Sequence, residues 1–336
     1  MDICYATDDH FCMQTGVSML SVLSHCSGEK IHFHVLDAGL SSKHREILSE
    51  LAEQQAATVY FYDVRFLLEE ISKRGQKQWG DFPTHATWAR LFLPELLPQT
   101  VHKVLYLDGD VIAVQDWTPL IHMEMGNCTL AAVEDCVTSS YRQSVGLHPG
   151  SSYHNAGVLL FQMDEWRKTY QRDWLDTWLC TPTAYPMADQ DVVNLMFEDR
   201  IRTLSLRYNY TAWFRALSLP DLQRLLEDHL LCRYTQQEVA LCDAQAVFIH
   251  FNTCSLLVRP WYCGATDPAS DRWLKFFRNS PWASQKLEPE PNNLSKGEQR
   301  DRKLYQLVGR KWFEPLHRID YTVRSNAKRL LKRRKP

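Results

Sequence analysis

Two carboxylates separated by one glycine, Asp108-Gly109-Asp110, are the side chains of this sequence best suited to hold a metal ion. They follow an apolar run from residue 104 that reads as a strand. In extended backbone, residues i and i+2 point to the same side, so both carboxylates are expected to converge outside the sheet. Adjacent carboxylates repel one another unless a cation lies between them. The pattern therefore predicts a divalent cation that binds phosphate oxygens and stabilises charge on a departing diphosphate.

The same acidic pair has two other interpretations. One is a solvated turn at the end of a strand. The other is the first motif of haloacid-dehalogenase-type phosphatases, which an apolar strand followed by Asp-x-Asp resembles and in which the first Asp is a nucleophile. That motif usually lies near the start of its domain. Here it follows three expected strands, and the sequence contains no matching later motif.

The elements that must position the pair alternate between strands and helices. Residues 3–6, 31–36 and 58–64 are expected to be strands, whereas 15–23 and the segment that follows Ser41-Ser42 have helical spacing. This order predicts an α/β fold with a mostly parallel central sheet and helices on its faces. Further strands are expected at 104–112, 130–133, 158–161 and 247–251, and further helices at 166–179 and 190–197.

Five segments, in order along residues 2 to about 283, resemble glycosyltransferase family 8. This family includes bacterial lipopolysaccharide galactosyl- and glucosyltransferases and glycogenin. The segments are Tyr5-Ala6-Thr7-Asp8-Asp9, Thr87-Trp88-Ala89-Arg90-Leu91, residues 104–111, His154-Asn155-Ala156-Gly157-Val158 and Ala188-Asp189-Gln190-Asp191. The resemblance implies a single nucleotide-binding domain of the GT-A type and a UDP-sugar donor. Their occurrence in order is more specific than any one segment.

The resemblance also implies which residues bind the donor. Ala6 and Asp8 would contact the uracil and ribose, and the small residues after Asn155 would leave room for the sugar ring. The full set implied for the donor is Ala6, Asp8, Arg90, Asp108, Asn155, Ala156, Gly157, Asp189, Gln190 and Arg259. Each motif also has a structural interpretation: a helix N-cap for Asp8, an ion pair for Arg90 and a tight turn at Gly157.

Three residues of this set would be catalytic by resemblance: Gln190, Asp189 and Arg90. Gln190 would lie near the anomeric carbon and Asp189 at the hydroxyls of the donor sugar. Because a glutamine is an uncharged and poor nucleophile, we favour front-face displacement with retention, in which Gln190 steadies the developing positive charge. A covalent intermediate on a carboxylate is the alternative. Alternatively, Asp189 has a structural role alone, because an acidic side chain in the first turn of a helix interacts favourably with the helix dipole.

His250 would complete the metal site with Asp108 and Asp110, again by resemblance; otherwise it reads as a core histidine. An imidazole beside two carboxylates suits Mn²⁺, with Mg²⁺ as the alternative. After His250 the chain departs from the family pattern, because a glycine is missing, the stretch is longer, and Arg259 stands where lysine is usual. Arg259 can hold a diphosphate with two donors. The departure also motivates a second hypothesis, an inactive or weak relative that only binds the nucleotide sugar.

Charge is distributed unevenly and suggests three regions. Residues 296–336 contain 14 Lys/Arg and four Asp/Glu, and the rest of the chain contains 24 and 36. We expect a GT-A domain at 1–283, a linker at 284–299 and a basic helical tail at 300–336. Apolar residues recur every three or four positions in the tail, which predicts binding to an anionic membrane surface. Docking on the acidic body is the alternative, and no nucleic-acid-binding motif is present.

The remaining features concern location. The sequence has no run of 18 apolar residues, its first residues do not read as a secretory signal, and its ten cysteines form no Cys-x-x-Cys pair. We therefore expect a cytoplasmic enzyme, peripheral on the inner face of a membrane.

The sequence-based hypothesis is a metal-dependent retaining transferase that moves glucose or galactose from a UDP-sugar to a glycan or lipid-linked glycan such as lipopolysaccharide.

Overall fold

A seven-stranded sheet forms the centre of the computed structural model, which describes residues 1–74, 86–173, 175–176 and 185–333. Its strand order is β3-β2-β1-β4-β7-β6-β8. The first four strands in sequence are parallel, and β7 is antiparallel to both of its neighbours. The strands are β1 (Asp2–Thr7), β2 (His32–Asp37), β3 (Thr58–Asp63), β4 (Lys103–Leu107), β6 (Leu130–Glu134), β7 (His154–Gln162) and β8 (Ile201–Leu204). The α/β class with a mostly parallel sheet is thus confirmed.

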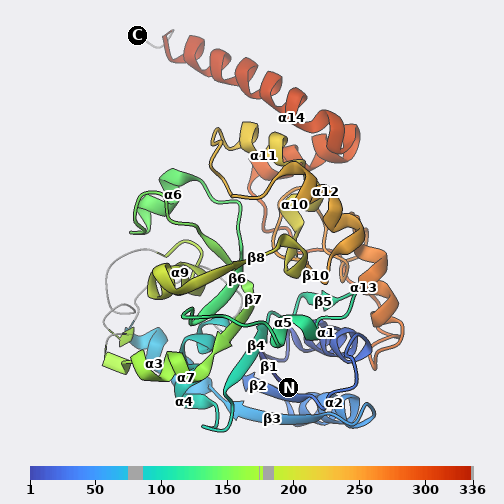
Figure 1. Ribbon diagram of the computed structural model, residues 1–336. Coiled ribbons are helices and arrows are strands. Elements are labelled where there is room, and N and C mark those ends of the chain that lie inside the picture. The colour runs from blue at the N-terminus through green and yellow to red at the C-terminus, as the bar shows by residue number, and fades with distance from the viewer. Residues whose placement is uncertain (75–85, 174, 177–184, 334–336) are drawn as a thin grey trace.

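Helices cover both faces of this sheet (Figure 1). On β1, Ile3 and Tyr5 belong to one buried cluster and Cys4 and Ala6 to the other, as expected for a strand buried on both sides. The first cluster contains residues of α1 (Cys12–Ser24) and α2 (Ser42–Glu53). The second contains residues of α3 (Arg65–Arg74), η1 (Ala86–Phe92), α4 (Leu93–Leu96), α7 (Met163–Thr169) and α9 (Asp189–Phe197).

A second, three-stranded sheet corrects the sequence-based prediction of one strand over 104–112. This sheet has the order β5-β10-β9, with β5 (Val111–Ala113), β10 (Phe248–His250) and β9 (Tyr210–Thr211). The chain must leave the central sheet after β4 so that β5 can pair with β10. It does so in a turn closed by the Val111 N–H, which donates to the Asp108 carbonyl at 3.1 Å. The acidic pair therefore lies in a turn and not in extended backbone.

Most other predicted elements are present with small shifts. Ser41 caps α2 as predicted, since its hydroxyl accepts from the His44 N–H. The helix predicted at 166–179 is interrupted after Thr169, where Tyr170 is extended. Residues 172–173 and 175–176 are helical again, and residues 174 and 177–179 lie outside the described part. The remaining helices are α5 (Thr118–Ile121), α6 (Ser139–Ser144), η2 (Glu198–Arg200), η3 (Leu206–Tyr208), α10 (Ala212–Ala216), α11 (Leu219–Leu225), α12 (Gln236–Gln245) and α13 (Ser270–Phe277).

The C-terminal segment forms α14 (Lys296–Arg333), whose distal part projects away from the body (Figure 1). Its helical backbone is interrupted at Gly309, with φ of 73°, whereas Pro315 lies inside the helix. Tyr305 and Phe313 are buried against the body. The last residues of the predicted tail, 334–336, lie outside the described residues. Among the helices of the described chain, none combines the length and the apolar character needed to cross a bilayer.

Candidate active site

Two residues of the turn after β4 and the last residue of β10 converge at one edge of the central sheet. The His250 Nε2 lies 3.1 Å from an Asp110 carboxylate oxygen and 3.9 Å from an Asp108 oxygen. One ligand atom from each of the three residues lies within 4.8 Å of the others. Two carboxylates and one imidazole form a donor set that suits Mn²⁺ or another divalent ion. The three residues predicted from the sequence as metal ligands therefore fit such an ion.

Two glycines allow this close arrangement. A Cβ atom at Gly109 would lie 2.5 Å from the Thr15 hydroxyl, and one at Gly157 would lie 2.1 Å from a carbon of the His250 ring. Any larger residue at either position would displace these neighbours. The small residues at 156–157 are expected from the sequence to leave room for a sugar ring. The structure gives Gly157 a further reason, because the metal-ligand imidazole occupies the space beside it.

Arg90, from η1, links the metal carboxylates to the first turn of α9. It is only 1% exposed, and its guanidinium lies 2.8 Å from oxygens of both Asp108 and Asp189. It also donates to the Ala156 carbonyl, and it lies over the ring of Tyr106. The ion-pair interpretation of Arg90 thus holds, but its partners are carboxylates of the site itself. One buried cation therefore fixes the relative positions of Asp108 and Asp189.

Gln190 is held by hydrogen bonds at both ends of its amide. The Ala156 N–H donates to its Oε1 at 2.9 Å, and its Nε2 donates to Asp135 at 3.2 Å. Asp135 also accepts from the Asn155 Nδ2 at 2.9 Å. Asp135 was not among the residues predicted from the sequence. It directly follows β6, just as Asp108 directly follows β4, and this position could have identified it. Gln190, Asn155 and Ala156 therefore lie together, joined by hydrogen bonds to one another and to Asp135.

The neighbouring Asp191, also in the first turn of α9, is fully buried. Its carboxylate accepts from the hydroxyls of Tyr141 and Tyr153 and from the Met187 N–H. Burial raises the pKa of this carboxyl, although these donors oppose the shift. All of its described contacts are therefore with the protein framework.

The residues predicted to bind the nucleotide lie at the same edge or near it. Ala6 and Asp8 are at the carboxyl end of β1, beside β4, which is where ligands bind in open α/β sheets. Asp8 accepts from the Phe11 N–H at 3.0 Å in the turn before α1, but the N-cap residue of α1 is Phe11 and no side chain caps the helix, so the N-cap interpretation of Asp8 is wrong. Arg259 is half-buried, with its guanidinium 4.9 Å from the centre of the Trp261 ring.

The two metal carboxylates differ in their electrostatic surroundings. Burial raises the pKa of Asp108, and Arg90 opposes that shift. Burial acts in the same direction on Asp110, but the nearby charges of His250 and Arg259 hold the pKa of Asp110 below its usual value. Arg259 is thus close enough to act on the metal site electrostatically, as a diphosphate-binding residue must be.

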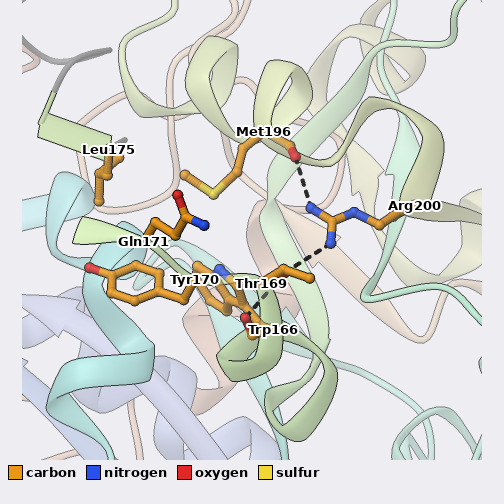
Figure 2. Close-up of a pocket in the computed structure, with 7 residues that line it drawn as sticks. All are labelled: Trp166, Thr169, Tyr170, Gln171, Leu175, Met196 and Arg200. Atoms are coloured by element: carbon orange, nitrogen blue, oxygen red, sulfur yellow. Dashed lines mark hydrogen bonds between the residues drawn. The ribbon is translucent and has the colours of Figure 1, made fainter. Parts of the chain in front are cut away.

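A hollow on another part of the molecule lies between α7 and the end of α9 (Figure 2). Arg200 reaches across it and donates to the Thr169 hydroxyl and to the Met196 carbonyl. None of the predicted site residues lines this hollow. Arg200 therefore ties the end of α9 to α7 and has no part in the candidate site.

The sequence and the fold are similar to those of known glycosyltransferases. The model of the family described as "Glycosyl transferase family 8" matches residues 2–262. A protein of Haemophilus influenzae is 26% identical over 65% of this chain and 65% of its own length. The lipopolysaccharide 1,3-galactosyltransferase of Salmonella typhimurium is 27% identical over 84% of this chain and 79% of its own. The crystal structure of the galactosyltransferase LgtC with donor and acceptor sugar analogues has the same fold, with a TM-score of 0.71 at 24% identity, covering 85% of this chain and 100% of that one.

Proposed function

Since the chain belongs to glycosyl transferase family 8, we propose that its active site transfers glucose or galactose from a UDP-sugar to a glycan. It is a retaining hexosyltransferase that acts on a lipopolysaccharide-type glycan. Its relatives include a lipopolysaccharide 1,3-galactosyltransferase of Salmonella typhimurium and a lipopolysaccharide 1,2-glucosyltransferase of Escherichia coli. The choice of UDP as carrier and the dependence on a metal ion are the parts of this proposal that experiments must test.

The observation that carries the proposal is the meeting of Asp108, Asp110 and His250 with a buried Arg90 that also holds Asp189. The three ligands would hold Mn²⁺, or Mg²⁺ as the alternative, which supplies Lewis-acid stabilisation of a departing diphosphate. Arg259, on the Asp110 side, would hold phosphate oxygens with its planar fork of donors. Ala6 and Asp8 would contact the uracil and ribose.

The arrangement around Gln190 favours front-face displacement over a covalent intermediate. The amide of Gln190 is neutral and fixed by Ala156 and Asp135, so it can orient toward developing positive charge but is a poor nucleophile. The carboxylate of Asp191 accepts hydrogen bonds from two tyrosines and a backbone N–H. Asp189 is engaged by Arg90 and by the Thr87 hydroxyl. These contacts support departure and attack on the same face, which retains configuration.

We further propose that residues 300–336 hold the enzyme on an anionic membrane, at the cytoplasmic face where a lipid-linked glycan acceptor would be presented. Two observations support this. The segment is strongly basic. Four large apolar side chains of α14 are exposed: Leu307, Trp312, Leu316 and Ile319. Tyr305 and Phe313 dock on the body instead, so docking and membrane binding would use different faces of one helix.

A panel of UDP-sugars, with and without Mn²⁺ and read by release of UDP, tests the proposal. We expect one UDP-hexose to be turned over only with metal, and Asp108→Ala or Asp110→Ala to abolish that turnover without unfolding the protein. Asp271→Ala, at an exposed position in α13, is the control. UDP binding without turnover of any sugar would favour the inactive-relative hypothesis. Release of phosphate from phosphomonoesters, with no response to UDP-sugars, would favour the phosphatase.

A further inference from the structure

The second nitrogen of the His250 ring faces a buried amide that the sequence analysis did not identify. His250 Nδ1 lies 3.1 Å from the Oδ1 of Asn209, which follows η3 and is 0% exposed. The Asn209 Nδ2 in turn donates to the Asn155 Oδ1 at 2.8 Å. From Asn155 the hydrogen bonds continue to Asp135 and then to Gln190. A chain of buried polar groups thus connects the metal ligand with the proposed catalytic glutamine.

The direction of every hydrogen bond in this chain is fixed by its two ends. The backbone N–H of Gly157 can only donate, and it lies 2.9 Å from Asn155 Oδ1. That contact turns the Asn155 NH₂ toward the Asp135 carboxylate, which accepts it. Asn209 must then direct its own NH₂ at Asn155 Oδ1. Its carbonyl oxygen therefore faces His250. The orientation of the Asn209 amide is thus fixed by the whole hydrogen-bond network, although a single amide considered alone could be placed either way.

The consequence falls on the imidazole. An amide oxygen at Nδ1 requires a proton on that nitrogen, so in the neutral imidazole that a metal ion binds, the lone pair of Nε2 is directed at Asp108 and Asp110. A ligating histidine is usually held in this way by a partner at its other nitrogen. Here the partner is a neutral amide whose second group is committed to Asn155.

We propose that Asn209 is a positioning residue that sets the tautomer and orientation of His250 and, through Asn155 and Asp135, couples the metal site to Gln190. The inference rests on the proposed function for the identity of the metal and of Gln190 as the group at the anomeric carbon. The two halves of the Asn209 amide have separate tasks. The carbonyl oxygen serves the metal ligand, and the NH₂ serves the route to Gln190.

Two variants separate these tasks. Asn209→Asp keeps an acceptor for the Nδ1–H but places an oxygen against Asn155 Oδ1, which is already bound to Gly157 N–H. Asn209→Leu removes both groups. The matched control is Thr211→Val in β9, a nearly isosteric change at a fully buried residue whose hydroxyl has no hydrogen-bond partner in the described structure.

The first measurement is the binding of Mn²⁺ to the full chain with UDP present and no sugar donor, from the electron paramagnetic resonance signal of free Mn²⁺. We expect Asn209→Leu to weaken binding roughly 10- to 100-fold. Asn209→Asp and Thr211→Val should stay within a few-fold of the wild type. With saturating Mn²⁺, kcat for the preferred UDP-hexose should fall at least tenfold in Asn209→Asp, which is on the order of the effect of one lost buried hydrogen bond. In Thr211→Val, kcat should stay unchanged.

A second measurement does not require turnover. Nitrogen chemical shifts of the His250 ring in the metal-free protein should show a proton on Nδ1 in the wild type and in Asn209→Asp, and its loss from Nδ1 in Asn209→Leu. Wild-type Mn²⁺ binding together with an unchanged Nδ1 proton in Asn209→Leu would overturn the positioning of His250. Unchanged kcat in Asn209→Asp would overturn the coupling to Gln190. If the wild type turned over no UDP-sugar, the proposed function would fail, while the metal and nitrogen data would still decide the role of Asn209 toward His250.

Discussion

At the scale of single residues, Arg90 is the side chain whose contacts are hardest to replace. It bridges Asp108 and Asp189 and donates to the Ala156 carbonyl, which needs a planar group with several donors. We expect Arg90→Lys to lower kcat/KM roughly 100-fold, because the loss of one buried charge-assisted hydrogen bond costs about 3 kcal/mol. Steady-state kinetics with saturating Mn²⁺ checks this. Arg65→Lys, at an exposed ion pair, is the control, and wild-type kcat/KM in Arg90→Lys would remove Arg90 from the mechanism.

Gly157 tests the packing of the metal ligand. A methyl group at this position would overlap the His250 ring, so Gly157→Ala must push the imidazole away from Asp108 and Asp110. We expect a stability loss of about 1–3 kcal/mol from overpacking and weaker Mn²⁺ binding, measured by chemical denaturation and by titration. Gly297→Ala is the matched control, since the nearest heavy atom to its new carbon is 3.7 Å away. Equal Mn²⁺ affinity in both variants would contradict this view of the site.

Residue type alone predicted part of this site. Asp108, Asp110 and Arg90 could be selected because charged side chains beside apolar runs need partners or a ligand. Asn209 could not, since a single asparagine between Tyr208 and Tyr210 has no local pattern. Its role depends on His250 and Asn155, which reach it only through the tertiary fold.

At the scale of elements, strand positions were predictable but sheet membership was not. The apolar runs in β1 and β2 predicted buried parallel strands, and five of the six residues in each are buried. β3 is parallel as well, but it lies at the edge of the sheet and none of its residues is buried. The run over 104–112 looks equally continuous, yet β5 belongs to a different sheet. Only pairing with β10, more than a hundred residues later, determines where the chain turns. That turn brings the carboxylates to His250, so local periodicity explained their convergence incorrectly.

The first residue of β7 gives this strand a dependence on pH. His154 is buried beside Thr203, and burial lowers its pKa to about 4 from 6.5. The unfolded chain takes up a proton near pH 6.5, whereas the folded protein does so only near pH 4. Acidification through this window therefore favours unfolding, by on the order of 3 kcal/mol from this group.

Denaturation curves of wild type and His154→Gln between pH 7 and pH 4 measure that contribution. The variant should lose less stability over the window. His148 is exposed beside Glu198, which raises its pKa, so its protonation stabilises the fold on acidification, and His148→Gln should change the slope in the opposite direction. Parallel curves for wild type and His154→Gln would show that His154 is not the responsible group.

At the scale of the whole molecule, an acidic body and a basic tail are joined by one helix with two apolar faces. The sequence predicted an amphipathic helix there. Apolar residues that recur every three or four positions are expected both in a helix that docks on the protein and in one that binds a membrane, so the repeat does not distinguish the two. The structure divides the repeat: Tyr305 and Phe313 are buried, and Trp312 and Ile319 are exposed. The helical backbone is interrupted at Gly309, between Tyr305 and Trp312, which no periodicity in the sequence could show.

Adjacent residues on these two faces allow a test in which each variant is the control for the other. Phe313 is 1% exposed, so Phe313→Ala should destabilise the protein by about 3 kcal/mol through the cavity it leaves. Trp312 is 57% exposed, so Trp312→Ala should leave the free energy of unfolding unchanged. On vesicles containing anionic lipid, however, Trp312→Ala should lower the partition coefficient roughly tenfold, because burying such a side chain is worth about 1.5 kcal/mol or more. Sedimentation with vesicles at low and high salt, with neutral lipid for comparison, measures this. Equal partitioning of Trp312→Ala and wild type would assign the exposed face of α14 to something other than the membrane, while the effect of Phe313→Ala on unfolding would still report how the tail is docked.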